Sequence, residues 1–290
     1  MEPDPALSFR VSQLRDEGLS RRRIDRSLAR PYWGIRSEVE TFDPVVRARQ
    51  LRPRLPADAF FSHVTAAQIW GLPLPRRVVQ DVRPHVSMPT PLRGMDTADV
   101  ISHAVRIDAS SDVVRVDGMR VSSVARLWIE MSSLLGLADL VALGDSILHR
   151  GLAREDELTR RAARPRFRGR LTARAALSLL DERAESPMES LLRVALVSAG
   201  LSPILVNQPL IDSRGGFVAR PDLRLADRPV VIEYDGDGHR SDPDQWRKDV
   251  ARYGAIEDLG FVVVRATAAD LPAFTRVIER VRRLARRPLN

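Results

Sequence analysis

The sequence predicts a mixed α/β (α+β) protein built from more than one domain. Its 290 residues suggest two domains or three, at about 100–200 residues per domain, with a single domain as the alternative. Its composition, 44% hydrophobic and 29% charged, is that of an ordinary globular protein. Stretches with helical periodicity alternate with short apolar runs typical of strands, most clearly after residue 185. These observations exclude a disordered or fibrous protein.

Residues 1–44 have the outline of a helix-turn-helix or winged-helix-like region. A first helix is predicted by apolar residues at helical spacing, namely Leu7, Val11 and Leu14. Gly18 interrupts this pattern, Ser20 can cap a second helix, and Pro31 ends that helix. Residues 32–36 follow as a short hairpin or wing. Two plain structural helices would explain the same pattern, so the DNA-binding interpretation depends on charge.

Arginine carries almost all of the net charge of +8, since Lys248 is the only lysine. Residues 10–36 hold eight arginines and three acids, and residues 160–174 hold seven arginines and no acid. Such clusters favour polyanions, because cationic side chains contact phosphates whatever the base sequence. We therefore expect DNA as a partner. The candidate DNA-binding residues are Arg21, Arg22, Arg23, Arg26, Arg30, Arg166, Arg168 and Arg170.

Residues 45–150 predict a small α+β middle domain, and residues 151–184 a basic helical connector. Within the middle domain, the pattern predicts helices over residues 62–70 and from Ser123 onward, and strands over residues 81–86 and 113–121. Four histidines occur without the spacing of metal ligands, namely His63, His85, His103 and His149. We expect them to be surface or hydrogen-bonded core residues and assign them no chemistry.

Residues 185–290 predict a C-terminal domain with the order helix, three strands, helix, strand, helix. Ser186 and Glu189 form an N-cap and a capping box around Pro187, and Gly200 ends this first helix. The three strand candidates are residues 204–211, 217–225 and 229–234.

The rest of this domain is expected to be a helix, a buried strand and an amphipathic helix. The middle helix spans residues 242–260 and carries Trp246, Val250 and Tyr253 on one side, which indicates core packing rather than base stacking. Residues 261–264 form the strand, and Thr267 to Asp270 offer another capping box. The apolar face of the last helix is Leu271, Phe274, Val277, Ile278, Val281 and Leu284.

Carboxylates at the ends of two predicted strands mark the place where we expect chemistry. Asp222 lies on one strand, and Glu233, Tyr234 and Asp235 end the next. If these strands are neighbours, Asp222, Glu233 and the main-chain carbonyl of Tyr234 form an oxygen site suited to Mg²⁺ or Mn²⁺. Such an ion polarises a phosphate and activates water. The chain has no cysteine, which excludes thiolate sites, and solvated strand-end acids are the alternative interpretation.

Three motifs occur in order in this domain: R-P-D at residues 220–222, V-V-I-E-Y-D-G-D-G-H at 230–239 and R-K-D-V-A-R at 247–252. Together they resemble the very-short-patch-repair-like endonuclease domain of the PD-(D/E)xK superfamily. The resemblance implies a restriction-endonuclease-like αβββαβα core with a metal site at Glu189, Asp222 and Glu233. It also relates His239 to the histidine that follows the glycine turn in the repair enzymes. For Glu189, a capping role alone is an equal alternative.

The chain departs from the superfamily motif at one position, because Asp235 stands where the motif has its lysine. That lysine helps to orient water and balances charge, so catalysis needs a substitute. The candidates are His239, Arg247 and Lys248. Alternatively, Asp235 is itself a ligand of the metal or of water, since the repair-like group often carries E-x-D-G here.

The N-terminal part, with residues 62–74 and 126–127, is similar to AbiEi-type antitoxins that have a winged-helix DNA-binding region. Two functions follow as hypotheses. The first is a metal-dependent DNA endonuclease, with RNA or branched DNA as alternative substrates. The second is a catalytically inactive DNA-binding regulator or antitoxin-like protein. No run approaches the ~18 apolar residues of a membrane span and no secretory pattern is evident, so we expect a cytoplasmic protein without a membrane partner.

Overall fold

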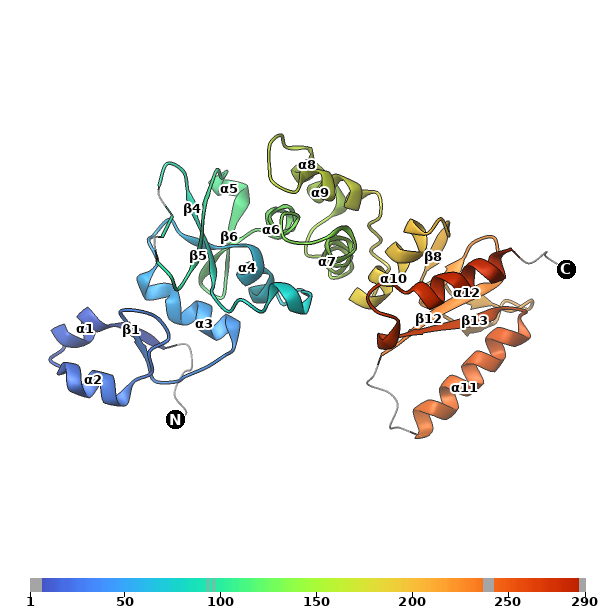
Figure 1. Cartoon of the computed structure of the whole chain (residues 1–290), viewed down its shortest axis with the longest axis horizontal. Helices are drawn as coiled ribbons and strands as arrows, with labels where there is room; N and C mark the ends of the chain where they lie inside the picture. Colours follow the sequence, from blue (N-terminus) through green and yellow to red (C-terminus); the bar gives the residue numbers. More distant parts are fainter. Residues whose placement is uncertain (1–6, 93, 96, 237–242, 287–290) are drawn as a thin grey trace. The chain divides into compact units, whose positions relative to one another are not determined.

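The protein has the mixed α+β structure that the sequence predicts, and its internal contacts divide it into two compact units. The computed structural model describes residues 7–92, 94–95, 97–236 and 243–286 (Figure 1). Unit 1 comprises residues 1–134 and 155–173, and unit 2 comprises residues 135–154 and 174–290. Each unit contains sheets and buried side chains of its own.

Unit 1 begins with two short helices between two paired strands. Strand β1 (Ser8–Arg10) pairs antiparallel with β2 (Ile35–Ser37), and α1 (Val11–Asp16) and α2 (Arg21–Ser27) lie between them in sequence. The Ser20 hydroxyl accepts a hydrogen bond from the Arg23 amide at 3.4 Å, which confirms the N-cap of the second helix. Ala29 and Ser37 form an antiparallel bridge around residues 32–36, where the sequence predicts a short hairpin or wing, and β2 also pairs with β1.

The second part of unit 1 is a five-stranded sheet in the order β5-β4-β3-β7-β6. Its strands are β3 (Phe60–Phe61), β4 (His85–Pro89), β5 (Ile101–Val105), β6 (Val113–Val116) and β7 (Met119–Ser122). The strand expected over residues 81–86 begins only at His85. Asp81 accepts a hydrogen bond from the Arg83 amide at 3.0 Å and so forms a turn, and Pro84 has no N–H for a strand ladder.

Helices pack on this sheet and enclose its core. Their bounds are α3 (Pro44–Leu51), α4 (His63–Ile69), α5 (Ala109–Asp112), α6 (Val124–Met131) and α8 (Glu155–Ala163), with single turns at Arg52–Arg54 and Arg76–Val78. Helix α6 contacts both α4 and α8. Phe60, Leu127 and Trp128 are fully buried between helices and sheet, as the predicted helix after Ser123 requires. Helix α9 (Arg170–Leu177) completes the basic segment.

Unit 2 is built on a four-stranded sheet in the order β13-β12-β11-β8. Its strands are β8 (Ile204–Val206), β11 (Leu223–Leu225), β12 (Val230–Asp235) and β13 (Val262–Thr267). Two of the expected strands are each broken in two, because β9 (Leu210–Ile211) and β10 (Phe217–Ala219) form a separate antiparallel pair. Strand β12 is antiparallel to β11 and parallel to β13.

Helices cover both faces of the unit 2 sheet (Figure 1). Ile232 belongs to the core cluster that holds side chains of α10 (Pro187–Ser198) and α12 (Thr275–Ala285). Val231 belongs to a smaller cluster with Ile256 and Tyr253 of α11 (Pro243–Asp258). Since side chains alternate along a strand, Glu233 lies on the same face of β12 as Val231. This alternation directs Glu233 toward α11.

Helix α7 (Leu137–His149) packs against α10 and belongs to unit 2, although the sequence placed it at the end of the middle segment. Asp145 of α7, which is 1% exposed, accepts hydrogen bonds from Ser190 Oγ and Arg193 Nη2, both at 2.6 Å. This buried ion pair joins the two helices.

Two expectations for the last third of the chain need correction. The Thr267–Asp270 capping box is confirmed, but it caps a single 3₁₀ turn, and α12 begins only at Thr275 because Pro272 disfavours helical backbone at Leu271. Val250 is 50% exposed and lies outside the core. Tyr253 packs against the core, as expected. Among the described residues, no helix combines the length and apolar character needed to cross a bilayer.

Candidate functional site

Asp222 and Glu233 face each other across the β11–β12 pair. Leu223 is the register partner of Ile232, so Asp222, directly before β11, lies opposite Glu233 in β12. The Tyr234 amide donates a hydrogen bond to Asp222 Oδ2 at 2.8 Å, which ties the first carboxylate to the second strand. Glu233 is only 4% exposed. The expected neighbouring strands therefore do bring these two acids together.

Glu189, in the first turn of α10, is held beside Asp222 by a residue that the sequence analysis missed. Asn207 donates its side-chain amide to Glu189 Oε2 at 2.7 Å and its backbone amide to the Asp222 carbonyl at 2.9 Å. Its φ of 46° lies in the left-handed region, where asparagine is enriched, so an Asn directly after a short strand was the available signal.

The capping role expected for Glu189 is only half correct. The Ser186 hydroxyl accepts a hydrogen bond from the Glu189 amide at 3.2 Å, as the N-cap requires. The Glu189 carboxylate, however, accepts from the Glu185 amide at 3.0 Å instead of the Ser186 amide. Since Glu189 Oε2 also takes the Asn207 bond, the carboxylate lies between the helix start and the acid pair rather than closing a capping box.

Burial and mutual repulsion hold the two acids partly protonated near neutral pH. Burial raises the pKa of Glu233 to about 7, and the negative charge of Asp222 adds to the rise. Burial likewise raises the pKa of Asp222 to about 6, with Glu189 and Asp235 contributing and the Tyr234 amide opposing. Desolvated acids that repel one another in this way would be stabilised by a bound cation.

A guanidinium already provides part of that positive charge. Arg252 of α11 donates from Nη1 to Glu233 Oε1 at 2.9 Å and lowers the pKa of Glu233 against the effect of burial. The residue ends the R-K-D-V-A-R motif, but the motif alone does not predict this contact. Arg252 lies four residues after Lys248, on the same helix face, and this spacing was the signal that could have found it.

Asp235, which replaces the motif lysine, pairs with a second guanidinium. Arg265 of the neighbouring strand β13 forms an ion pair with Asp235 Oδ2, and Tyr253 Oη donates to Asp235 Oδ1 at 3.3 Å. The other proposed substitutes lie outside the described residues: His239 falls in the interval 237–242, and for Arg247 and Lys248 only the helical backbone of α11 is described.

The three acids offer the oxygen chemistry of a hard divalent cation, although their ligand atoms do not lie close together as a set. The described residues leave Glu189 Oε1, Asp222 Oδ1 and Glu233 Oε2 without a hydrogen bond, so each acid keeps one oxygen for a ligand. Carboxylate oxygens are the ligands that Mg²⁺ and Mn²⁺ prefer. Among the described residues, the one set of three acids or histidines with ligand atoms all within 4.8 Å lies in unit 1, so these three acids are more widely spaced.

The arginines proposed to contact DNA lie on the surface of unit 1. All five candidates on and after α2 are exposed, as are Arg166 and Arg168, whereas Arg170 is half-buried. Asp25 pairs with Arg30 at 2.9 Å and with Arg36 at 2.7 Å and so neutralises part of this surface.

A groove beside α2 adds an aromatic ring to these cations. The groove is lined by several arginines, among them Arg15, Arg21 and Arg30, and by Trp33. Trp33 is 80% exposed. The Arg54 guanidinium lies 5.8 Å from the Trp33 ring centroid.

Comparison with known proteins gives relatives without an assigned function. No protein-family model matches the chain. Two proteins of Mycobacterium tuberculosis, from strains H37Rv and CDC 1551, are each 28% identical to it over 158 residues, and both are named only as uncharacterized proteins. The match covers 54% of this chain and 58% of each relative, so the chain spans little more than half their length.

Proposed function

We propose that the protein is a metal-dependent endonuclease that hydrolyses phosphodiester bonds of DNA, with its catalytic site in unit 2. The observation that carries this proposal is the facing pair of half-buried Asp222 and buried Glu233, whose pKa values are raised to about 6 and about 7 by burial first and by the charges of neighbouring acids second. The resemblance to the very-short-patch-repair-like group agrees with this placement, and a cytoplasmic location suits such an enzyme.

Asp222 and Glu233 would hold the cation, Glu189 would support it, and the Tyr234 carbonyl stays the fourth candidate. A bound Mg²⁺ or Mn²⁺ supplies charge to the scissile phosphate and a more acidic water. Arg252 donates a hydrogen bond to Glu233. Its positive charge can therefore offset the negative charge of the transition state in place of the missing motif lysine. Arg265 offsets the negative charge of Asp235. Asp235 then serves to position Tyr253, whose hydroxyl donates a hydrogen bond to it.

Unit 1 would hold the nucleic acid. Its exposed arginines contact phosphates without sequence preference, and the exposed Trp33 in the basic groove offers a surface on which a base can stack. The proposal includes DNA binding by a winged-helix-like region of unit 1.

A second function is favoured by a specific observation. Both Glu233 and Asp235 are paired with guanidinium groups, from Arg252 and Arg265, and such pairing can replace the metal in a nuclease fold that has lost catalysis. In that case the protein is a DNA-binding regulator or antitoxin-like protein.

Cleavage of supercoiled and linear DNA in Mg²⁺ or Mn²⁺ separates the two functions. The wild type should nick DNA, Asp222→Asn should lose this activity, and Asp227→Asn should keep it, because Asp227 is an exposed acid of the same unit outside the site. Cleavage that is equal in wild type and Asp222→Asn would refute the endonuclease. Tight binding to a defined promoter without any hydrolysis would decide for the regulator.

A further inference from the structure

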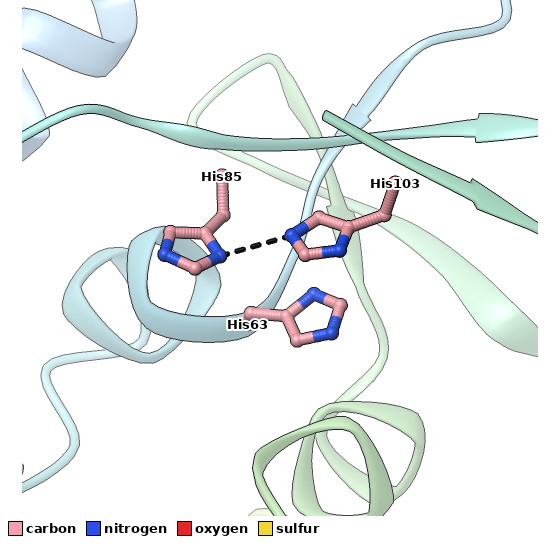
Figure 2. Close-up of side chains that lie close together, drawn as sticks. All are labelled: His63, His85 and His103. Atoms are coloured by element: carbon pink, nitrogen blue, oxygen red, sulfur yellow. Dashed lines mark hydrogen bonds between the residues drawn. The ribbon is translucent and has the colours of Figure 1, made fainter. Parts of the chain in front are cut away.

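Three histidines that the sequence spacing did not connect meet in unit 1. His63 begins α4, while His85 and His103 lie on the parallel neighbours β4 and β5. His103 is the register partner of Ser87, two residues from His85, so both histidines project from the same face of the sheet. Their side chains and that of His63 point toward one another (Figure 2). We call His63, His85 and His103 the histidine trio.

The ring nitrogens of the histidine trio are close enough to share one ion. One ligand nitrogen from each residue lies within 4.8 Å of the others. His85 Nδ1 and His103 Nε2 are 3.0 Å apart and share a hydrogen bond that a bound ion would replace, and the rings of His63 and His103 stack with centroids 3.9 Å apart (Figure 2). Two imidazole nitrogens bound to one tetrahedral ion at about 2.0–2.1 Å would lie about 3.3 Å apart, so the pair is already within a few tenths of an ångström of that spacing.

The surroundings supply the hydrogen bonds that orient metal-binding imidazoles. His63 Nδ1 lies 3.0 Å from Ser62 Oγ, which in turn accepts from Ser87 Oγ at 2.7 Å. In the tautomer whose Nδ1 proton is directed to Ser62, His63 keeps the lone pair of Nε2 for a ligand. Burial lowers the pKa of His63 to about 2 and that of His85 to about 4, so both rings are neutral at physiological pH.

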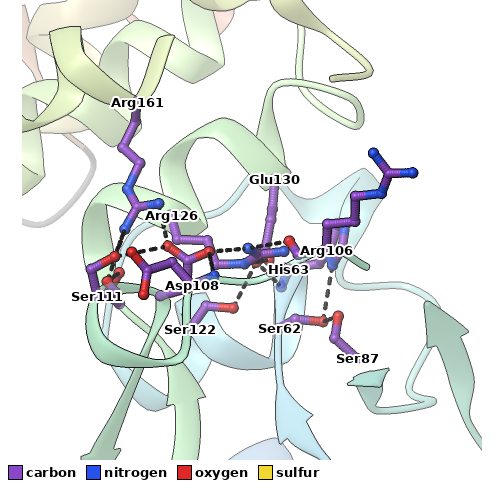
Figure 3. A network of polar contacts seen from close by, with 12 residues as sticks. Ser62, His63, Ser87, Arg106, Asp108, Ser111, Ser122, Arg126, Glu130 and Arg161 are labelled. Carbon is purple, nitrogen blue, oxygen red and sulfur yellow. Dashed lines mark hydrogen bonds and ion pairs between the residues drawn. The ribbon is translucent and has the colours of Figure 1, made fainter. Parts of the chain in front are cut away.

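A buried ionic network fixes the backbone at His63 (Figure 3). The His63 amide donates to Glu130 Oε2 at 3.2 Å, and Arg126 donates to Glu130 Oε1 at 2.6 Å and to Asp112 Oδ2 at 2.7 Å. His63 has a φ of 48°, a strained left-handed conformation that persists only where the surroundings enforce it. Glu130 and Asp112 also neutralise Arg126, whose charge acts on His63.

We propose that the histidine trio is a binding site for a divalent transition-metal ion of the Zn²⁺ class, with a fourth position open to water or a small anionic ligand. Imidazole nitrogens suit Zn²⁺, Cu²⁺ or Ni²⁺ and not Mg²⁺, so this site is chemically distinct from the oxygen site of unit 2. His63 and His85 are 8% and 6% exposed and His103 is half-buried, which leaves access at His103. The proposal does not depend on nuclease activity.

Zn²⁺ and Co²⁺ titrations of the metal-free chain of 290 residues test this site. The double variant His149→Ala/His239→Ala leaves the histidine trio as the only imidazoles of the five in the chain. This variant should bind one Zn²⁺ tightly, shift the imidazole ¹⁵N resonances of all three residues, and give the intense visible bands of tetrahedral Co²⁺. Excess Mg²⁺ should leave the bound Zn²⁺ in place.

His103→Gln in the same background should weaken Zn²⁺ binding by at least about 100-fold, whereas Glu233→Gln, which alters the oxygen site, should leave it unchanged. Circular dichroism of His103→Gln verifies that the variant folds. If it does not fold, the ¹⁵N shifts of the folded double variant still decide. Unshifted imidazole resonances with saturating Zn²⁺, or equal affinity in the folded His103→Gln variant, would show that the trio is a hydrogen-bonded core cluster and overturn the proposal.

Discussion

Lowering the pH from about 8 to about 5.5 should weaken Mg²⁺ or Mn²⁺ binding in unit 2 by roughly 100-fold. Protons and the cation compete for Asp222 and Glu233, whose pKa values are about 6 and about 7. At about pH 5.5, acids with these values are ionised in about 25% and about 3% of molecules, so both are ionised in less than about 1%. At about pH 8 the doubly ionised fraction is about 90%. The ratio of these fractions sets the expected loss.

Lowering the pH should stabilise the cation-free protein, whereas it weakens cation binding. For Glu233, the pKa of the folded state lies above that of the unfolded state, near 4.5, so unfolding favours ionisation. Its destabilising effect is absent below about pH 4.5, grows as the pH rises to about 7, and is constant above that. Added Mg²⁺ should therefore raise the melting temperature at about pH 8 and leave it almost unchanged at about pH 5.5.

Isothermal titration calorimetry across this pH range measures the affinity, and thermal unfolding measures the stability. Glu233→Gln removes one of the two competing protons and should flatten the pH dependence, while Asp227→Asn should retain it in full. A wild-type affinity that stays constant between about pH 5.5 and about pH 8 would show that these carboxyls do not bind the ion.

Three further predictions concern other parts of the molecule. Arg252→Ala should move the pH midpoint of cation binding upward, because Arg252 lowers the pKa of Glu233, and Arg252→Lys should restore it; equal midpoints in a calorimetric titration would contradict this. Arg126→Ala leaves the buried Glu130 without its cation and Asp112 with only Arg161 and Arg164, and should lower the free energy of unfolding by about 3–5 kcal/mol in urea. The exposed Arg160→Ala should cost at most about 0.5 kcal/mol, and similar losses in the two variants would exclude the network as the cause. Replacing the three arginines 21–23 by glutamine should reduce the slope of log affinity for DNA against log salt by about 3, whereas Arg283→Gln should not change it; an unaltered slope would remove them from the interface.

Local patterns in the sequence predicted much of the architecture. Ser186 as an N-cap, the Thr267–Asp270 capping box and the strand order around Glu233 depend on residues a few positions apart, which interact however the rest of the chain folds. The same holds for Asp222 and Glu233, because strands that follow each other closely in the chain and pair as neighbours have few possible registers.

Tertiary structure alone decided which side chains neutralise one another. Arg252 reaches Glu233 from a helix 19 residues later, and Arg265 reaches Asp235 across a parallel strand pair. His63, His85 and His103 come from a helix start and two strands, so no local spacing connects them. Contacts of this kind follow from how the sheet and helices pack, and packing depends on the whole core rather than on any short motif.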